Sequence, residues 1–301
     1  MPRIILSGIM RNKIDYRYFR QIISQYLDHF LEERMGVLRS SDIEPVHRMR
    51  VASRRLRAAL SVFKSIFPAK KTRFWKKEIS KIGLALGAAR QLDVQIRFLE
   101  SLKNRPKDNF NTEALIELLK KRRMRAQKQI DIVLKDFEVN KVILGLKNSL
   151  KEICPGANKQ LIDAFNLEKG AIILKRLDSL MEFGPYVFKP ESVKELHHMR
   201  IAAKKLRYAL EILRPWYGAR FDKYIRASRN IQDLLGDLHE FDCLAATLSD
   251  YSRKQNKDFD NAGIDLIREC IRLRKGIYVK FLRLWKEIEK SRLWVKLRKE
   301  I

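Results

Sequence analysis

The chain has 301 residues and a formal net charge of +28 at pH 7, because 64 Lys and Arg residues face only 36 Asp and Glu residues. A thermally adapted surface raises Lys and Glu together, so the imbalance excludes that explanation and favours a polyanionic partner. Gly and Pro are scarce (12 and 8), which favours helices over sheets. No apolar run reaches the roughly 18 residues that a membrane-spanning helix requires.

Helical periodicity divides the first half of the chain into segments separated by short loops. The first predicted helix begins near Asp15 and ends at Gly36, and a loop follows at 39–43. Pro45 suits the start of the second helix, since a first-turn residue needs no partner for its N–H. The second to fourth helices are expected from Pro45 to about residue 66, from 72 to about 102, and from 112 towards 153 with a break near 137–140.

A linker at 154–158, which contains Pro155 and Gly156, divides the chain into two halves, 1–153 and 159–301. The second half repeats the order of helices, which are expected at about 167–183, from 190 onwards, at 221–254, and from 261 to the end with a break near 289. No segment alternates with a period of two residues. The predicted fold class is therefore all-α, with four helices in each half.

Cysteine usage and the N-terminus bear on the compartment. Cys154, Cys243 and Cys270 lie far apart and form no metal-binding spacing, so they are expected to be reduced thiols. The apolar run before Arg11 is too short for a signal peptide. The sequence therefore predicts a cytoplasmic protein.

One stretch of the first half has a near copy in the second half. Residues 46–63, VHRMRVASRRLRAALSVF, align without a gap with residues 196–213, LHHMRIAAKKLRYALEIL, at an offset of 150. On a helix, His47, Arg50, Arg54 and Arg57 share one face. The opposite face is apolar and consists of Met49, Ala52, Leu56, Ala59, Leu60 and Phe63. Each copy is therefore an amphipathic helix whose apolar back requires a core and whose cationic front requires an anion.

The repeated pattern H-x-x-R-[VI]-x-x-[RK]-[RK]-L-R-x-x-L resembles the conserved-histidine α-helical domain (CHAD) family, and the resemblance covers almost the whole chain. It implies two pseudo-symmetric antiparallel four-helix bundles, together one domain, around a basic central groove or pore that binds inorganic polyphosphate. One departure is that Lys204 and Lys205 stand where the first copy has Arg54 and Arg55. Lys lacks the bidentate fork of Arg, so the two halves are expected to hold phosphate unequally.

Basic residues are segregated from acidic ones along several helices. Residues 45–77 contain no Asp or Glu, and similar basic runs lie at 118–130, 196–210 and 270–286. Like charges at i, i+4 destabilise a helix by about 0.2–0.5 kcal/mol per pair, so these runs indicate surfaces kept free for phosphates rather than ordinary solvated faces. The predicted polyphosphate-binding residues come from the second, third and fourth helices of each half: His47, Arg50, Arg54, Arg55, Arg57, Lys77, Lys121, Arg122, Arg125, Lys128, His197, Arg200, Lys204, Lys205, Arg207, Arg226, Arg272 and Arg274.

The third helix of each half carries a second shared motif, in which residues 86–93 (LGAARQLD) match residues 235–242 (LGDLHEFD). Asp93 and Asp242 are expected to pair with arginines of the repeated helix and to orient them. Glycines in a helix cost about 1 kcal/mol each relative to Ala, so these are expected to permit close approach of another helix. They are Gly83, Gly87 and Gly236.

The repeated histidines, His47 and His197, have three interpretations. As metal ligands they need further donors, and their cationic neighbours oppose a bound cation. A phosphohistidine relay lacks any nucleotide-binding partner sequence in the chain. A histidine that donates to phosphate, or anchors a neighbouring helix, suits the pattern better, and the sequence leaves phosphate, helix and metal open. The remaining histidines, His29, His198 and His239, are expected to have surface or packing roles.

No catalytic set is recognisable, since the chain has no Walker loop, no H-E-x-x-H motif and no supported Ser/His/Asp or Cys/His cluster. CHAD domains can be joined to a triphosphate hydrolase domain marked by E-x-E-x-K. The nearest string here, at 287–290, is one residue short and lies in a helical stretch.

The sequence therefore predicts a protein that is not an enzyme and needs no cofactor or metal. Its predicted role is to bind inorganic polyphosphate as a targeting or regulatory module at polyphosphate granules, with sulfate or phosphate as mimics of the ligand. Nucleic acid is the second choice, because most aromatic residues occupy apolar stripes rather than the basic faces on which bases would stack. A metal-dependent phosphohydrolase is the third. The oligomeric state is left open.

Overall fold

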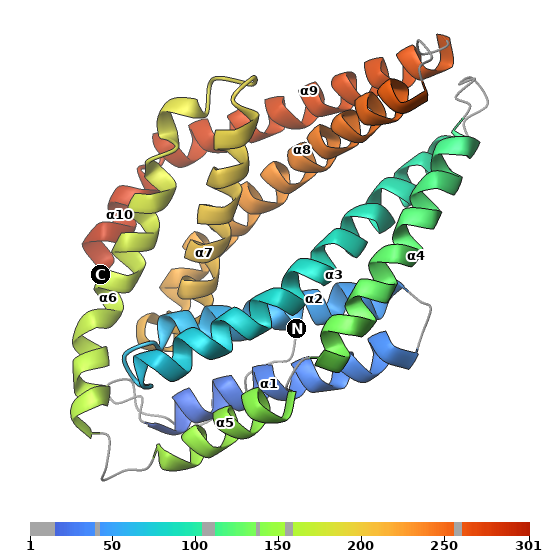
Figure 1. Ribbon diagram of the computed structural model, residues 1–301. Coiled ribbons are helices and arrows are strands. Elements are labelled where there is room, and N and C mark those ends of the chain that lie inside the picture. The colour runs from blue at the N-terminus through green and yellow to red at the C-terminus, as the bar shows by residue number, and fades with distance from the viewer. Residues whose placement is uncertain (1–15, 40–42, 104–111, 137–138, 154–158, 256–260) are drawn as a thin grey trace.

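A computed structural model describes residues 16–39, 43–103, 112–136, 139–153, 159–255 and 261–301, and helices make up nearly all of them (Figure 1). The first half contains α1 (Tyr16–Arg39), α2 (Ile43–Val62), α3 (Ala69–Lys103), α4 (Glu113–Asp136) and α5 (Val139–Glu152). The second half contains α6 (Lys159–Met181), α7 (Val193–Tyr217), α8 (Asp222–Gln255), α9 (Asn261–Lys290) and α10 (Leu293–Glu300), with 3-10 helices at Gly184–Tyr186 and Gly218–Phe221. No described residue lies in a strand, so the all-α prediction is confirmed.

The predicted end of the first helix is wrong. Gly36 lies inside α1, which continues to Arg39. The glycine serves a close approach, because a Cβ at this position would lie 3.2 Å from the Cβ of Pro45 in α2. The break expected near residue 289 occurs at Ser291–Arg292, between α9 and α10. The break at 137–140 falls partly on residues 137–138, which lie outside the described part of the chain, as do the linker 154–158 and Cys154.

The apolar back of each repeated helix enters the core as expected. All six predicted core residues of the first copy are buried, and Met199, Leu206 and Leu213 are buried in the second. Aromatic rings from both halves meet in this core, where Phe19 of α1 lies 5.1 Å from Phe165 of α6 between ring centroids. The two halves therefore share one hydrophobic core rather than forming two separate ones.

Two long hairpins, α3–α4 and α8–α9, run towards the same side of the molecule (Figure 1). They meet in a second apolar cluster, where the rings of Phe98 and Phe241 are 5.4 Å apart in an edge-to-face arrangement. Gln95 Nε2 also donates a hydrogen bond of 3.0 Å to Thr247 Oγ1. The hairpins thus fix α3 and α8 relative to each other, and these helices pack against the repeated helices α2 and α7 respectively.

Within the described ranges, no helix combines the length and the apolar character needed to cross a bilayer. The division into 1–153 and 159–301, and an axis of pseudo-symmetry between the halves, stay predictions.

Candidate anion-binding site

The cationic faces of α2 and α7 border a shared cleft. Two adjoining cavities, of about 620 Å³ and about 230 Å³, have Arg50, Ile201 and Lys204 in common. We call the two cavities together the cationic cleft. α2 packs against α7, and α3 packs against α8, so the repeated motif of each half contributes to one space.

Basic side chains from four helices contribute to the lining of the larger cavity. Their contribution follows from helical spacing on α2, where residues 50, 54 and 57 share a face. The basic lining residues are Arg50, Arg54 and Arg57 of α2, Lys76 of α3, Arg176 of α6, and Lys204 and Lys205 of α7. Tyr208 of α7 also lines this cavity, and its hydroxyl group is buried without a hydrogen-bond partner. No Asp or Glu is among the described residues that line it.

The smaller cavity differs, because it combines Arg90 and Arg200 with a histidine pair and one carboxylate, Glu240. His197 Nδ1 lies 3.1 Å from His239 Nδ1, so the repeated histidine of the second half contacts the neighbouring helix α8. Burial, followed by the charges of His197 and Arg200, lowers the pKa of His239 to about 4. Among the described residues, no group of three or more His, Cys, Asp or Glu side chains is arranged to hold a metal ion.

Glycines of α3 and α8 seat the arginines of the repeated motif. A Cβ at Gly87 would lie 3.6 Å from Arg50 Nε, and a Cβ at Gly236 would lie 3.4 Å from Arg200 Nε. Side chains larger than Ala would therefore compete with the guanidinium groups for the same space. The group beside each of these glycines is thus an arginine side chain of the repeated helix, rather than the closely packed helix that the sequence predicted.

The central cations of the cleft have no carboxylate partners. In the part of the chain that the structure describes, no ion pair forms at Arg50, Arg54, Arg200 or Lys204. Arg54 Nε, Arg200 Nε and Arg90 Nη1 are buried without any hydrogen-bond acceptor. A buried donor left unsatisfied costs about 1–3 kcal/mol, and more when it is charged, so an anion with several oxygens would relieve a real penalty here.

Burial and the charges of neighbouring cations lower the pKa values of two of these residues. Burial, followed by the charges of Arg54 and Arg200, lowers the pKa of Lys204 to about 7. Burial, followed by the charge of Arg54, lowers the pKa of Arg50 to about 10. Like charges disfavour one another's ionised form in a partly dry site, and a bound anion reverses that effect.

The predicted partners of the shared aspartates are wrong. Asp93 accepts a hydrogen bond of 2.6 Å from Arg123 Nε of α4, and Asp242 accepts one of 2.5 Å from Arg274 Nε of α9. Each carboxylate joins the two helices of its own hairpin, because it lies on the face of α3 or α8 that turns towards the next helix. The arginines of α2 and α7 are thereby left without these carboxylates.

The structure does not bring every predicted site residue into the cleft. Arg274 is held by Asp242, Lys121 pairs with Glu117, and Arg272 pairs with Glu269. Arg207 lies 3.8 Å from Glu211, and the partly buried His47 has an Nδ1 without a partner. The other predicted residues that do not line either cavity are the half-buried Arg55 and Arg122 and the exposed Lys77, Arg125, Lys128 and Arg226. Phosphate binding by these residues stays a prediction.

Sequence reasoning missed several cleft residues: Lys76, Arg90, Arg176, Tyr208 and His239. For α3 the sequence did indicate the missing residues. Residues 76, 83, 87 and 90 are spaced by seven, four and three positions, so they share one face of the helix. Lys77 precedes Gly87 by ten residues, so its side chain is rotated around the helix axis by about 280° from that face. Arg176 carried no such signal, since the equivalent residue of the first half is Tyr26.

The model of the CHAD domain family matches residues 21–249. The chain belongs to the CHAD family.

Two solved structures share the fold of this CHAD protein. The crystal structure of the CHAD domain from the plant Ricinus communis is 22% identical, with a TM-score of 0.62 over 88% of this chain and 85% of that one. PptA from Streptomyces chartreusis is 15% identical, with a TM-score of 0.63 over 90% of this chain and 99% of that one. None of the curated proteins compared with this chain matches it.

Proposed function

We propose that this CHAD protein binds inorganic polyphosphate in the cationic cleft. The observation that carries the proposal is the set of buried guanidinium nitrogens, on Arg54, Arg90 and Arg200, that have no acceptor. Each phosphate of a polyphosphate chain offers anionic oxygens to such donors, and Arg binds them with charge-assisted, often bidentate hydrogen bonds. The same anion would restore the ionised form of Lys204, whose pKa is lowered to about 7.

The dimensions of the cleft favour a polymer over a single phosphate. Arg50 and Lys204 border both cavities, so one ligand can pass from the larger to the smaller. Cations from α2, α3, α6 and α7 are spread along this course rather than gathered at one point. A flexible chain of charges can contact them in turn.

Nucleic acid is the less favoured polyanion. Non-specific binding of single strands uses aromatic side chains as platforms, at about 1–3 kcal/mol per stacked base. Tyr208 is the only Phe, Tyr or Trp among the described residues that line the two cavities. Its ring is largely buried and lies beside the guanidinium group of Arg207, 4.7 Å from ring centroid to Cζ.

Competition at fixed ionic strength tests the choice of ligand. We expect polyphosphate to bind in titration calorimetry with an affinity that falls steeply with salt, because binding releases counterions. We also expect single-stranded and duplex DNA of matched total charge to compete weakly. Equal competition by DNA would replace the proposal with a nucleic-acid-binding function.

We also propose that the cleft binds polyphosphate without cleaving it, and that the protein acts as a targeting or regulatory module at polyphosphate granules. Glu240 is the only carboxylate among the described residues that line the two cavities; burial and the charge of Asp237 raise its pKa, and Arg200, Arg90 and Arg50 oppose that rise. Release of orthophosphate from polyphosphate in the presence of Mg²⁺ or Mn²⁺ would show instead that the protein is a phosphohydrolase. A fluorescent fusion should localise to the granules, and should lose that localisation when Arg50 and Arg200 are both replaced by Ala.

A further inference from the structure

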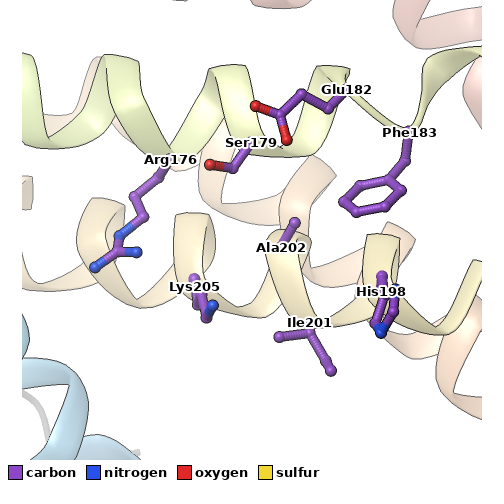
Figure 2. Close-up of a pocket in the computed structure, with 8 residues that line it drawn as sticks. All are labelled: Arg176, Ser179, Glu182, Phe183, His198, Ile201, Ala202 and Lys205. Carbon is purple, nitrogen blue, oxygen red and sulfur yellow. The ribbon is translucent and has the colours of Figure 1, made fainter. Parts of the chain in front are cut away.

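A second groove leads away from the cationic cleft between α6 and α7. It is a cavity of about 250 Å³ and shares Arg176, Ile201 and Lys205 with the larger cavity of the cleft. Figure 2 shows Arg176 and Lys205 at one end of this groove, with Phe183 and His198 facing each other at the other end. We call it the α6–α7 groove.

The two ends of the α6–α7 groove suit different parts of a ligand. Arg176 and Lys205 provide positive charge at the end next to the cleft. The rings of Phe183 and His198, 6.2 Å apart between centroids and inclined at 50° to each other, provide planar aromatic surfaces at the far end. Glu182 lies beside the aromatic end on the α6 side, where its carboxylate repels phosphate and can accept hydrogen bonds from N–H groups (Figure 2).

The aromatic end of this groove is not repeated at the corresponding described positions of the first half, at the same offset of 150. Where the second half has Phe183 and His198, the first half has Glu33 and Arg48. These two form an ion pair, in which the single N–H group at Arg48 Nε is shared between the two carboxylate oxygens at 2.8 Å and 2.9 Å. The position of Arg176 is occupied by Tyr26. The aromatic end of the α6–α7 groove is thus a feature of one half alone.

We propose that the α6–α7 groove binds the nucleoside of a nucleoside oligophosphate, whose phosphates extend past Arg176 and Lys205 into the cationic cleft. This rests on the proposed function, since the cleft supplies the phosphate contacts. A bare polyphosphate chain leaves the rings of Phe183 and His198 unused, whereas a purine base can stack on them. The exocyclic amino group of adenine can donate to Glu182, which fixes the direction of the ligand.

The test compares ATP with inorganic tripolyphosphate, two ligands with the same number of phosphates, by titration calorimetry at one salt concentration. We expect ATP to bind about tenfold more tightly, which is about 1.4 kcal/mol. Long-chain polyphosphate is measured alongside as the control for the cleft itself. Equal affinities for ATP and tripolyphosphate would overturn the inference and leave polyphosphate binding intact.

Two variants place the effect in the groove. His198→Ala removes an exposed ring, and Phe183→Glu with His198→Arg recreates the ion pair of the first half. Both should abolish the tenfold preference for ATP while leaving tripolyphosphate and polyphosphate affinity within about twofold. A preference that survives in both variants would also overturn the inference. If ATP and tripolyphosphate bind with the tenfold preference but long-chain polyphosphate does not bind, the proposed function fails and the nucleoside inference stands.

Discussion

Equivalent positions in the two halves carry different charges at the edge of the cationic cleft. Ser61 of the first half is surrounded by Arg57 and Lys76 of the same half and by Arg176 of the second half. We call these three cations the first basic cluster. Ser61 Oγ accepts hydrogen bonds from Arg176 Nη2 at 3.1 Å and from Lys76 Nζ at 3.5 Å. No carboxylate lies among the described residues that line this cavity, so the three cations are available to an anion.

The corresponding cluster of the second half contains a carboxylate. Glu211 stands where the first half has Ser61, and it lies 3.8 Å from Arg207 Nε and 3.2 Å from Arg229 Nη2. Tyr26 takes the place of Arg176, and the buried Ile225 takes the place of Lys76. A repeated helix therefore reproduces the fold of a site without reproducing its charge, because a few positions on neighbouring helices decide which cations stay free.

The largest effect is expected at the centre of the cleft, where the halves contribute equally. Replacing Arg50 and Arg200 together with Ala should weaken polyphosphate binding by at least about 100-fold, since hydrogen bonds to charged groups contribute about 1.5–3 kcal/mol each. The free energy of unfolding should be unchanged or higher, because repulsion among the cleft cations is relieved. Calorimetric titration and thermal melting measure the two quantities.

A matched control replaces two cations that are exposed and already paired. Lys121 and Arg272 bind Glu117 and Glu269 on their own helices. Their double replacement by Ala should change affinity by less than about threefold. If it weakens binding as much as the loss of Arg50 and Arg200, the basic faces of α4 and α9 belong to the site and the cleft is not its centre.

Exchanging the acid between the two clusters tests the comparison directly. Ser61→Glu should lower polyphosphate affinity about tenfold, because the new carboxylate would lie beside Arg176 and Lys76. It would correspond to Glu211 of the second half. Glu211→Ser should raise affinity by a few-fold, since Arg207 and Arg229 then become available. Binding that is unaffected by Ser61→Glu would show that the first basic cluster takes no part.

The two equivalent arginines should differ when each is replaced alone. Arg57→Gln is expected to weaken binding about fivefold, whereas Arg207→Gln should have less than a twofold effect because Glu211 already faces that residue. The affinities of both variants are to be measured at two salt concentrations. An equal loss in the two variants would contradict the asymmetry of the halves.

The smallest expected effect is the change of polyphosphate affinity with pH. Burial and the charges of Arg54 and Arg200 lower the pKa of Lys204 to about 7, so this lysine is largely neutral at pH 8. A bound phosphate raises that pKa, and binding above pH 7 therefore takes up a proton. Affinity should rise about threefold as the pH falls from 9 to 7, above the range in which His197 and His239 titrate, since burial lowers the pKa of both.

Calorimetry in buffers with different ionisation enthalpies measures this proton uptake. Lys204→Arg should abolish it, because the guanidinium group stays ionised throughout that pH range. Wild-type uptake that persists in the variant would assign the proton to another group.

Local periodicity accounts for the parts of the structure that were predicted correctly. The amphipathic faces of α2 and α7 follow from side-chain type at helical spacing, and a break near the end of the last long helix was also expected. Errors arose where the phase along a helix was not followed, as with Lys77 in place of Lys76. They also arose where a residue had a choice of neighbours, as with Asp93, which binds Arg123 of α4 rather than an arginine of α2.

The amino-acid order alone sufficed to specify an all-helical chain with two related cationic helices, because helix formation and amphipathicity depend on residues a few positions apart. Tertiary packing decided which of the many Lys and Arg side chains lack a carboxylate, since that depends on which helices meet. It also decided that Phe183 and His198 border an open groove while Glu33 and Arg48 form an ion pair. Whether a charged side chain has a partner of opposite charge depends on the residues packed around it. Sequence spacing does not determine which residues a hundred positions away will be packed there.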